Sequence, residues 1–111
     1  MKEVFRLEIE KKEIPIDWEG EKKNVVIRKF TFGIENEIRR QSTKLKYVGT
    51  VPHASVDVGA FMEFALLKSI MKAPFKFNSI EDIKNLPARL GKKIYDEIEK
   101  FNNLSELKKE S

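Results

Sequence analysis

The stretch VGAFMEFALLKSIM, Val58–Met71, decides the fold of this chain. It contains only two charged residues, Glu63 and Lys68, in a protein in which 36% of the residues are charged. At about 100° per residue, its apolar side chains point to almost every side of a helix. A helix that is apolar all round must be buried all round. We therefore expect a central core helix, or a helix that is shared with a partner.

The sequence before this helix predicts a small antiparallel sheet. Residues 4–10 and 14–18 alternate between apolar and polar side chains, which is typical of half-buried strands. Residues 25–32 are rich in β-branched and aromatic side chains and predict a third strand. Pro15 has no backbone N–H to donate, so its strand is expected at an edge of the sheet. The charged segment 19–23 is expected to connect the second and third strands.

Further helices are predicted on both sides of the central stretch. Residues 34–46 place acidic residues early and basic residues late, which is the order that favours a helix dipole. Residues 79–86 begin with a sequence similar to a capping box and predict a short helix. Residues 88–102 carry apolar side chains at helical spacing, with charged side chains on the other face, and predict a last amphipathic helix.

Together these elements predict an α+β fold, with a small N-terminal antiparallel sheet of three strands followed by a bundle of three to four helices. A length of 111 residues corresponds to one domain. We assign residues 1–104 to a single α+β domain, with strands within 4–32 and helices within 34–103. Residues 105–111 are expected to form a polar tail.

The composition limits the chemistry that this chain can carry out. It contains no cysteine and one histidine, which excludes disulfides, thiol catalysis and sulfur-based metal sites. The five glycines form no phosphate-binding loop. We therefore expect no metal and no cofactor. Since no stretch is long and apolar enough for a membrane span or a signal peptide, we expect a cytoplasmic protein without membrane contact.

No catalytic site is expected. His53, Ser55 and Asp57 lie in or beside a loop predicted over residues 47–54, but a triad needs side chains that converge from separate elements. We interpret Ser55 or Asp57 as the cap of the central helix. Two pairs of adjacent carboxylates in the last predicted helices are interpreted as solvated helix faces. These interpretations favour a protein that is not an enzyme.

An apolar group is the first candidate for partner binding. If Phe61 and Leu66 face the sheet, several other apolar side chains lie partly on the far side of the central helix. The last helix can cover these side chains, or they can form a groove or an oligomer seam. Methionine adapts to varied partners, and an exposed apolar patch usually marks an interface. The candidate residues of this group are Met62, Phe64, Leu67 and Met71.

A basic group is the second candidate. There is no acidic residue between Glu37 and Asp57, and the whole net charge of +4 lies in this segment. Its charges are expected to meet an acidic protein partner, the phosphates of a nucleic acid, or only water. The candidate residues of this group are Arg39, Arg40 and Lys44.

Three stretches, in this order, carry a resemblance to a known family. They are FTFGIENEIRRQ at 30–41, FMEFALLKSIMKAPF at 61–75 and LGKKIYDEIEKFNNLSE at 90–106. Together they resemble the tail assembly chaperones of long-tailed bacteriophages and related prophages. The resemblance implies an N-terminal β portion before a small helical domain. It also implies a non-enzymatic role in the host cytoplasm: binding a long helical tape measure protein, keeping it soluble, and helping tail tube subunits to assemble around it.

We therefore expect a viral or prophage tail assembly chaperone with two protein partners, the tape measure protein and the tail tube protein. Whether it also forms a homo-oligomer is left open. Two alternatives are a small basic nucleic-acid-binding regulator of a mobile element and a structural virion subunit of the tail or connector. Four basic residues would give only weak, salt-dependent binding to nucleic acid. Phe64→Asp or Leu67→Asp is predicted to abolish partner binding and to leave the domain folded.

Overall fold

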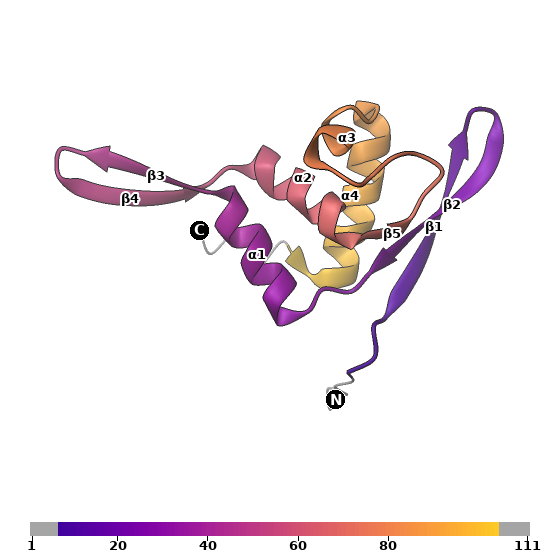
Figure 1. The fold of residues 1–111 in the computed structure, drawn as a ribbon, viewed down its shortest axis with the longest axis horizontal. Coiled ribbons are helices and arrows are strands. Elements are labelled where there is room, and N and C mark those ends of the chain that lie inside the picture. The colour runs from indigo at the N-terminus through magenta and orange to yellow at the C-terminus, as the bar shows by residue number, and fades with distance from the viewer. Residues whose placement is uncertain (1–6, 105–111) are drawn as a thin grey trace.

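The computed structural model describes residues 7–104 and places a β-hairpin at each end of the long axis, with the helices between them (Figure 1). The principal axes measure 54, 40 and 20 Å. The elements, in chain order, are β1 (Lys11–Trp18), β2 (Glu21–Arg28), α1 (Phe32–Ser42), β3 (Thr43–Val48), β4 (Val51–Val56), α2 (Val58–Ser69), β5 (Ile70–Lys72), α3 (Ile80–Lys84) and α4 (Ala88–Asn102).

The first sheet has three antiparallel strands in the order β1-β2-β5, so the predicted α+β fold with a small three-stranded sheet is confirmed. The connection between β1 and β2 is shorter than the predicted segment 19–23. It consists of Glu19 and Gly20, which have φ angles of 52° and 83°. Positive φ at both central residues is typical of the type I′ turn, whose twist matches that of paired strands.

The third strand of this sheet is not the predicted one. Residues 7–10, the described part of the predicted strand 4–10, lie outside any strand, and residues 1–6 lie outside the described part of the chain. The short strand β5 takes the place instead, because Ile70 pairs with Ile27 and its side chain is buried. The buried Ser69 hydroxyl also donates a hydrogen bond to the Arg28 carbonyl oxygen at 3.2 Å, which fixes the end of α2 against β2.

The helix predicted over 34–46 is shorter and begins earlier. It starts at Phe32 after Thr31, whose hydroxyl accepts a hydrogen bond from the Ile34 N–H at 3.2 Å. It ends at Ser42, and the chain continues directly into β3. Its Ile38 side chain is buried in the core, so α1 is a packed helix as well as a surface one.

A second antiparallel pair, β3 with β4, projects from the helices between α1 and α2 (Figure 1). We call this hairpin, residues 43–56, the arm. It lies where the sequence predicted the end of a helix and a loop over 47–54, and outside the predicted strand range 4–32. Residues 44–47 alternate between polar and apolar side chains, which is the period of a strand. Gly49 supplies the φ of 65° that its two-residue turn requires.

The central helix α2 packs against α1, α3 and α4. It begins after Asp57, whose carboxylate accepts a hydrogen bond from the Ala60 N–H at 3.1 Å, so Asp57 is the cap and Ser55 is not. It ends two residues before the predicted Met71, because Ile70 and Met71 belong to β5. Its buried residues line one side and join the core, which comprises Ile14, Ile16, Val25, Ile27, Ile38, Phe61, Ala65, Leu66, Ile70, Ile83, Ile94, Tyr95, Ile98 and Leu104.

The last two helices agree with the sequence. The Ser79 hydroxyl accepts a hydrogen bond from the Asp82 N–H at 3.2 Å, as expected for the start of α3. Pro87 stands just before α4 as its N-cap residue. The helix stops at Asn103, whose φ of 56° places it in the left-handed region that ends many helices. Asn102 accepts a hydrogen bond from the Phe30 N–H at 2.7 Å, which joins this end to the segment before α1.

Candidate protein-binding surfaces

The predicted basic residues lie at the end of α1 and at the base of the arm. Arg39 and Arg40 are exposed in the last turn of α1, and Lys44 lies in β3. The Arg40 guanidinium contacts the Glu37 carboxylate at 2.7 Å, and the Lys44 ammonium contacts the Asp57 carboxylate at 2.8 Å. The structure therefore brings the three residues into one region, where two of them already carry an ion pair.

Asp57 connects the arm to the helices. Its carboxylate contacts Lys44 and caps α2, and its backbone N–H donates to the Ser42 carbonyl oxygen at 2.8 Å. The hydrogen bond from Lys44, followed by the one from the Ala60 N–H, lowers the pKa of Asp57 below its ordinary value. The same hydrogen bond raises the pKa of Lys44. Both strands of the arm are thus held where they leave the helices.

The predicted apolar residues do not form one continuous surface. Met62, Phe64 and Leu67 are half-buried on α2 and pack against the core, so the monomer covers them in part. Met71 lies on β5 and is 37% exposed. Of the four, only Met62 borders a described hollow, a shallow one of about 240 Å³ between α2, α3 and the start of α4. A partner-binding groove formed by all four side chains therefore stays a prediction.

The arm exposes the apolar side chains that sequence reasoning missed. Leu45, Tyr47, Val48 and Val51 are 57, 65, 67 and 55% exposed. The cross-strand register places Leu45 opposite Ala54 and Tyr47 opposite Pro52. Opposite residues in an antiparallel pair share a face, so Leu45, Tyr47, Pro52 and Ala54 make one face of the arm apolar, while Val48 and Val51 lie on the other face beside the turn. The alternation over 44–47 was the signal in the sequence, but Leu45 was assigned to the end of a helix and Tyr47 to the loop that follows it.

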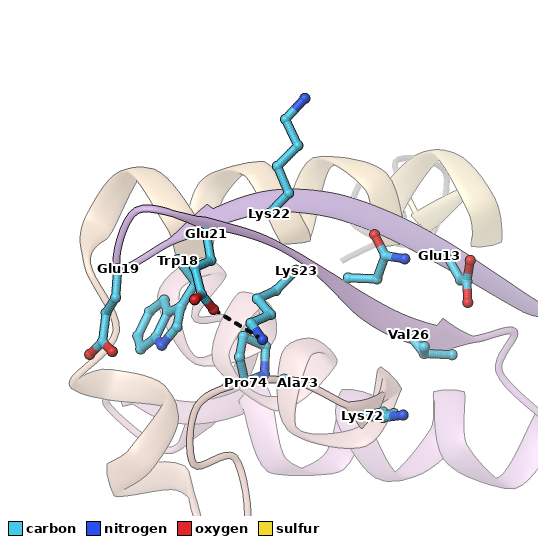
Figure 2. Close-up of a pocket in the computed structure, with 11 residues that line it drawn as sticks. Glu13, Trp18, Glu19, Glu21, Lys22, Lys23, Val26, Lys72, Ala73 and Pro74 are labelled. Carbon is cyan, nitrogen blue, oxygen red and sulfur yellow. Dashed lines mark ion pairs between the residues drawn. The ribbon is translucent and has the colours of Figure 1, made fainter.

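A second, larger hollow lies beside the turn of the β1–β2 hairpin (Figure 2). Its volume is about 820 Å³, and its walls carry both acidic and basic side chains. The Glu21 carboxylate and the Lys23 ammonium lie 3.2 Å apart, and Lys22 points away from the other side chains (Figure 2). The aromatic wall is Trp18, which packs on Phe75 with ring centroids 5.4 Å apart. Charges of both signs give this hollow no clear preference for an anion or a cation.

The described part of the chain offers neither a cluster of metal-binding side chains nor a membrane-spanning helix. Within residues 7–104, no group of three or more histidine, aspartate or glutamate side chains could hold a metal ion. In the same range, no helix combines the length and the apolar character that crossing a membrane requires. The candidate surfaces of the described part are therefore the arm, the partly covered face of α2 and the two hollows.

Comparisons with known proteins were made by family model, by curated sequence and by solved structure. None of the three finds a match to this chain.

Proposed function

We propose that this protein is a non-enzymatic tail assembly chaperone, which binds a long helical tape measure protein and promotes assembly of the tail tube around it. The observation that carries the proposal is the arm, on which four large apolar side chains are more than half exposed, Leu45 and Tyr47 on one face and Val48 and Val51 on the other. Contiguous exposed apolar side chains usually mark a surface that binds another polypeptide. A chaperone for amphipathic helices needs such a surface with charge around it.

The positions of the three resembling stretches support the same proposal. Residues 30–41 lead into and form most of α1, residues 61–75 form most of α2 together with β5, and residues 90–106 cover most of α4. The first two of these stretches lie on either side of the arm. The half-buried residues of α2 add further apolar side chains.

Co-expression tests the proposal. The full chain is produced together with the long helical protein encoded beside its gene, and the soluble fraction is analysed by size-exclusion chromatography. The expected result is that the helical protein stays soluble only with the chain and elutes with it. A matched pair of variants is Leu67→Asp, on the half-buried face of α2, and Lys22→Glu, on the exposed face of β2. The first is expected to lose the complex and the second to keep it.

Two results would contradict the proposal. The first is a helical protein that precipitates equally with and without the chain. The second is the chain itself as a regular component of purified particles, which would favour the structural virion subunit.

A nucleic-acid-binding regulator is the second candidate function, favoured by the absence of acidic residues from 38 to 56. Titration with duplex DNA at low and at moderate salt distinguishes the two functions. A regulator must bind at low salt and lose affinity steeply as the salt concentration rises. The proposed chaperone shows no such binding at low salt.

A further inference from the structure

We propose that the arm is the docking element for an acidic polypeptide segment that also carries apolar side chains and belongs to a second protein. This inference rests on the proposed function and deepens it, because it names the surface that holds the partner. It also moves the main contact from the predicted face of α2 to residues 43–56.

The register of the arm gives it two different faces. One carries Leu45, Tyr47, Pro52 and Ala54, and the other carries Lys44, Lys46, His53 and Ser55, with Val48 and Val51 beside the turn. All ten side chains are exposed. A hairpin that packs one face on its own protein keeps that face buried, whereas both faces of this arm are open to solvent. An isolated two-stranded hairpin is also only marginally stable in water, so a partner that covers the apolar face would stabilise it.

The positive charge of residues 38–56 favours an acidic partner. Residues 38–56 contain no acidic residue, and the ion pair with Asp57 offsets only Lys44. Within residues 7–104, neither Arg39 nor Lys46 has an ion-pair partner. An acidic partner would meet these two unpaired cations, and complementary charge of this kind directs association and selects between partners.

A second copy of the chain is not favoured as the molecule that binds the arm. Two arms that pair edge to edge along β3 would bring Lys44 and Lys46 of one copy close to the same lysines of the other, and like charges across a strand pair are destabilising. A nucleic acid fits the basic face alone. It offers nothing to the apolar face, where Leu45 and Ala54 are aliphatic.

Contacts within the monomer also hold the base of the arm against the helices. Ser42 and Asp57 are joined by a backbone hydrogen bond at its base, and the Lys44–Asp57 ion pair lies beside it. Because Val48 and Val51 flank a two-residue turn, the backbone groups of Tyr47 and Pro52 point to the outer edges. Pro52 has no N–H, so strand addition along β4 is blocked there. The partner must therefore lie on the apolar face or along β3.

Fluorescence anisotropy with synthetic probes tests this inference on the full chain. The first probe is an amphipathic helical peptide of about 20 residues, with leucine on one face and glutamate elsewhere. The second has the same leucines with lysine in place of glutamate, and the third is a duplex DNA of similar length. The glutamate peptide is expected to bind at least about tenfold more tightly than either of the others.

Variants locate the contact. Leu45→Thr combined with Tyr47→Thr keeps strand-forming residues in β3 and is expected to weaken binding of the glutamate peptide about thirtyfold. Lys46→Glu is expected to weaken it and to remove much of its salt dependence. The matched controls are Phe32→Ser, which removes an exposed apolar side chain outside the arm, and Lys22→Glu, which reverses an exposed charge at the other end of the molecule. Both controls are expected to bind as the wild type does, and circular dichroism verifies that each variant is folded.

The outcomes separate this inference from the proposed function. Equal binding of the two peptides, tighter binding of the duplex, or unchanged binding by the Leu45–Tyr47 variant would overturn the docking role of the arm. If the chain solubilises the long helical protein, and Leu67→Asp abolishes this while the Leu45–Tyr47 variant does not, the proposed function stands and the arm inference fails. If neither the peptide nor the long helical protein binds, both fail.

Discussion

The Lys44 ammonium and the Asp57 carboxylate meet at 2.8 Å and join the first strand of the arm to the residue that caps α2. The two residues are thirteen positions apart in sequence, and they become neighbours because the hairpin returns the chain to its own base. The Asp57 carboxylate thus contacts the first strand of the arm and also caps the central helix.

Asp57→Ala is expected to lower the melting temperature by a few degrees, because α2 loses its cap and the arm loses its ion pair. Asp57→Asn keeps a good capping side chain and removes only the charge, and Lys44→Met removes only the ion pair. Since the pair is largely exposed, both of these variants are expected to melt close to the wild type. Thermal unfolding followed by circular dichroism makes the comparison, and an Asn variant as unstable as the Ala variant would show that the charge dominates.

Neighbouring leucines on α2 are expected to respond differently to the same substitution. Leu66 is buried and Leu67 is half-buried. Leu66→Asp places a charge in the core and is expected to unfold the domain. Leu67→Asp is expected to fold with reduced stability and to lose the partner. Urea unfolding of the two variants, followed by the co-expression experiment, checks this. An unfolded Leu67→Asp protein would assign this residue to the core.

Truncation of Phe61 is expected to be the most damaging of the large-to-small changes on α2. Its side chain is 1% exposed, so Phe61→Ala leaves a cavity and should cost about 3–5 kcal/mol of unfolding free energy. Phe32→Ala is the matched control, because Phe32 is 82% exposed, and its cost should be about 0.5 kcal/mol or less. The denaturant midpoints of the two variants give the comparison. Similar midpoints would contradict the placement of Phe61 in the core.

Acid is expected to destabilise the protein through three carboxylates. Hydrogen bonds from Lys12 to Glu97, from Arg40 to Glu37 and from Lys44 to Asp57 are the main causes that lower the pKa values of these groups. The unfolded chain therefore binds protons at a higher pH than the folded chain does. Their stabilising contribution is complete above the ordinary pKa values of 4.5 for glutamate and 3.8 for aspartate, and it is lost as the pH falls through the lowered values.

Denaturant midpoints measured from neutral pH down to acid test this direction. The variant Glu97→Gln combined with Asp57→Asn should show a shallower loss of stability than the wild type. At alkaline pH the dependence is opposite for Lys44. Its contribution to stability is complete below the ordinary pKa of 10.5, and it is lost as the pH rises through the raised pKa. A wild-type midpoint that does not change in acid would contradict these pKa shifts.

The single tryptophan offers a local probe of the polar hollow. Trp18 is half-buried and packs on Phe75 with the rings inclined at 52°. Phe75→Ala is expected to expose the indole ring to water and to shift its fluorescence emission to longer wavelength. Phe101→Ala is the control, because that ring contacts Lys29 instead. An unchanged emission maximum in Phe75→Ala would contradict the contact between Trp18 and Phe75.

The sequence predicted the helices with local signals and missed the features that depend on distant pairing. α4 follows from its apolar spacing and from the asparagines at its end, and the start of α3 follows from Ser79. The strand β5 has only three residues, too few for a pattern, and it forms because Ile70 reaches Ile27 across the fold. No property of the segment 70–72 alone indicates this pairing.

The candidate site was predicted in part, and here the missed feature is a local hairpin. Arg39 and Arg40 lie where a basic helix end was expected. Lys44 was expected on that helix as well, but β3 begins one residue before it, and the hairpin then carries Lys44 to Asp57. The exposed Leu45 and Tyr47 were missed because Leu45 was assigned to the end of a helix and Tyr47 to a loop. Phe64 and Leu67 were expected on a groove and lie half-buried against the core.

The proline in β4 has a consequence for the behaviour of the free protein. Short segments rich in valine, leucine and tyrosine are typical starting points for amyloid growth, in which each new chain adds to the row of backbone donors of the previous one. Pro52 interrupts that row on one side of the arm, and Pro15 interrupts it along β1 at the opposite end of the molecule. The two prolines thus limit the addition of further strands along β4 and β1, whereas the outer edge of β3 keeps its backbone donors.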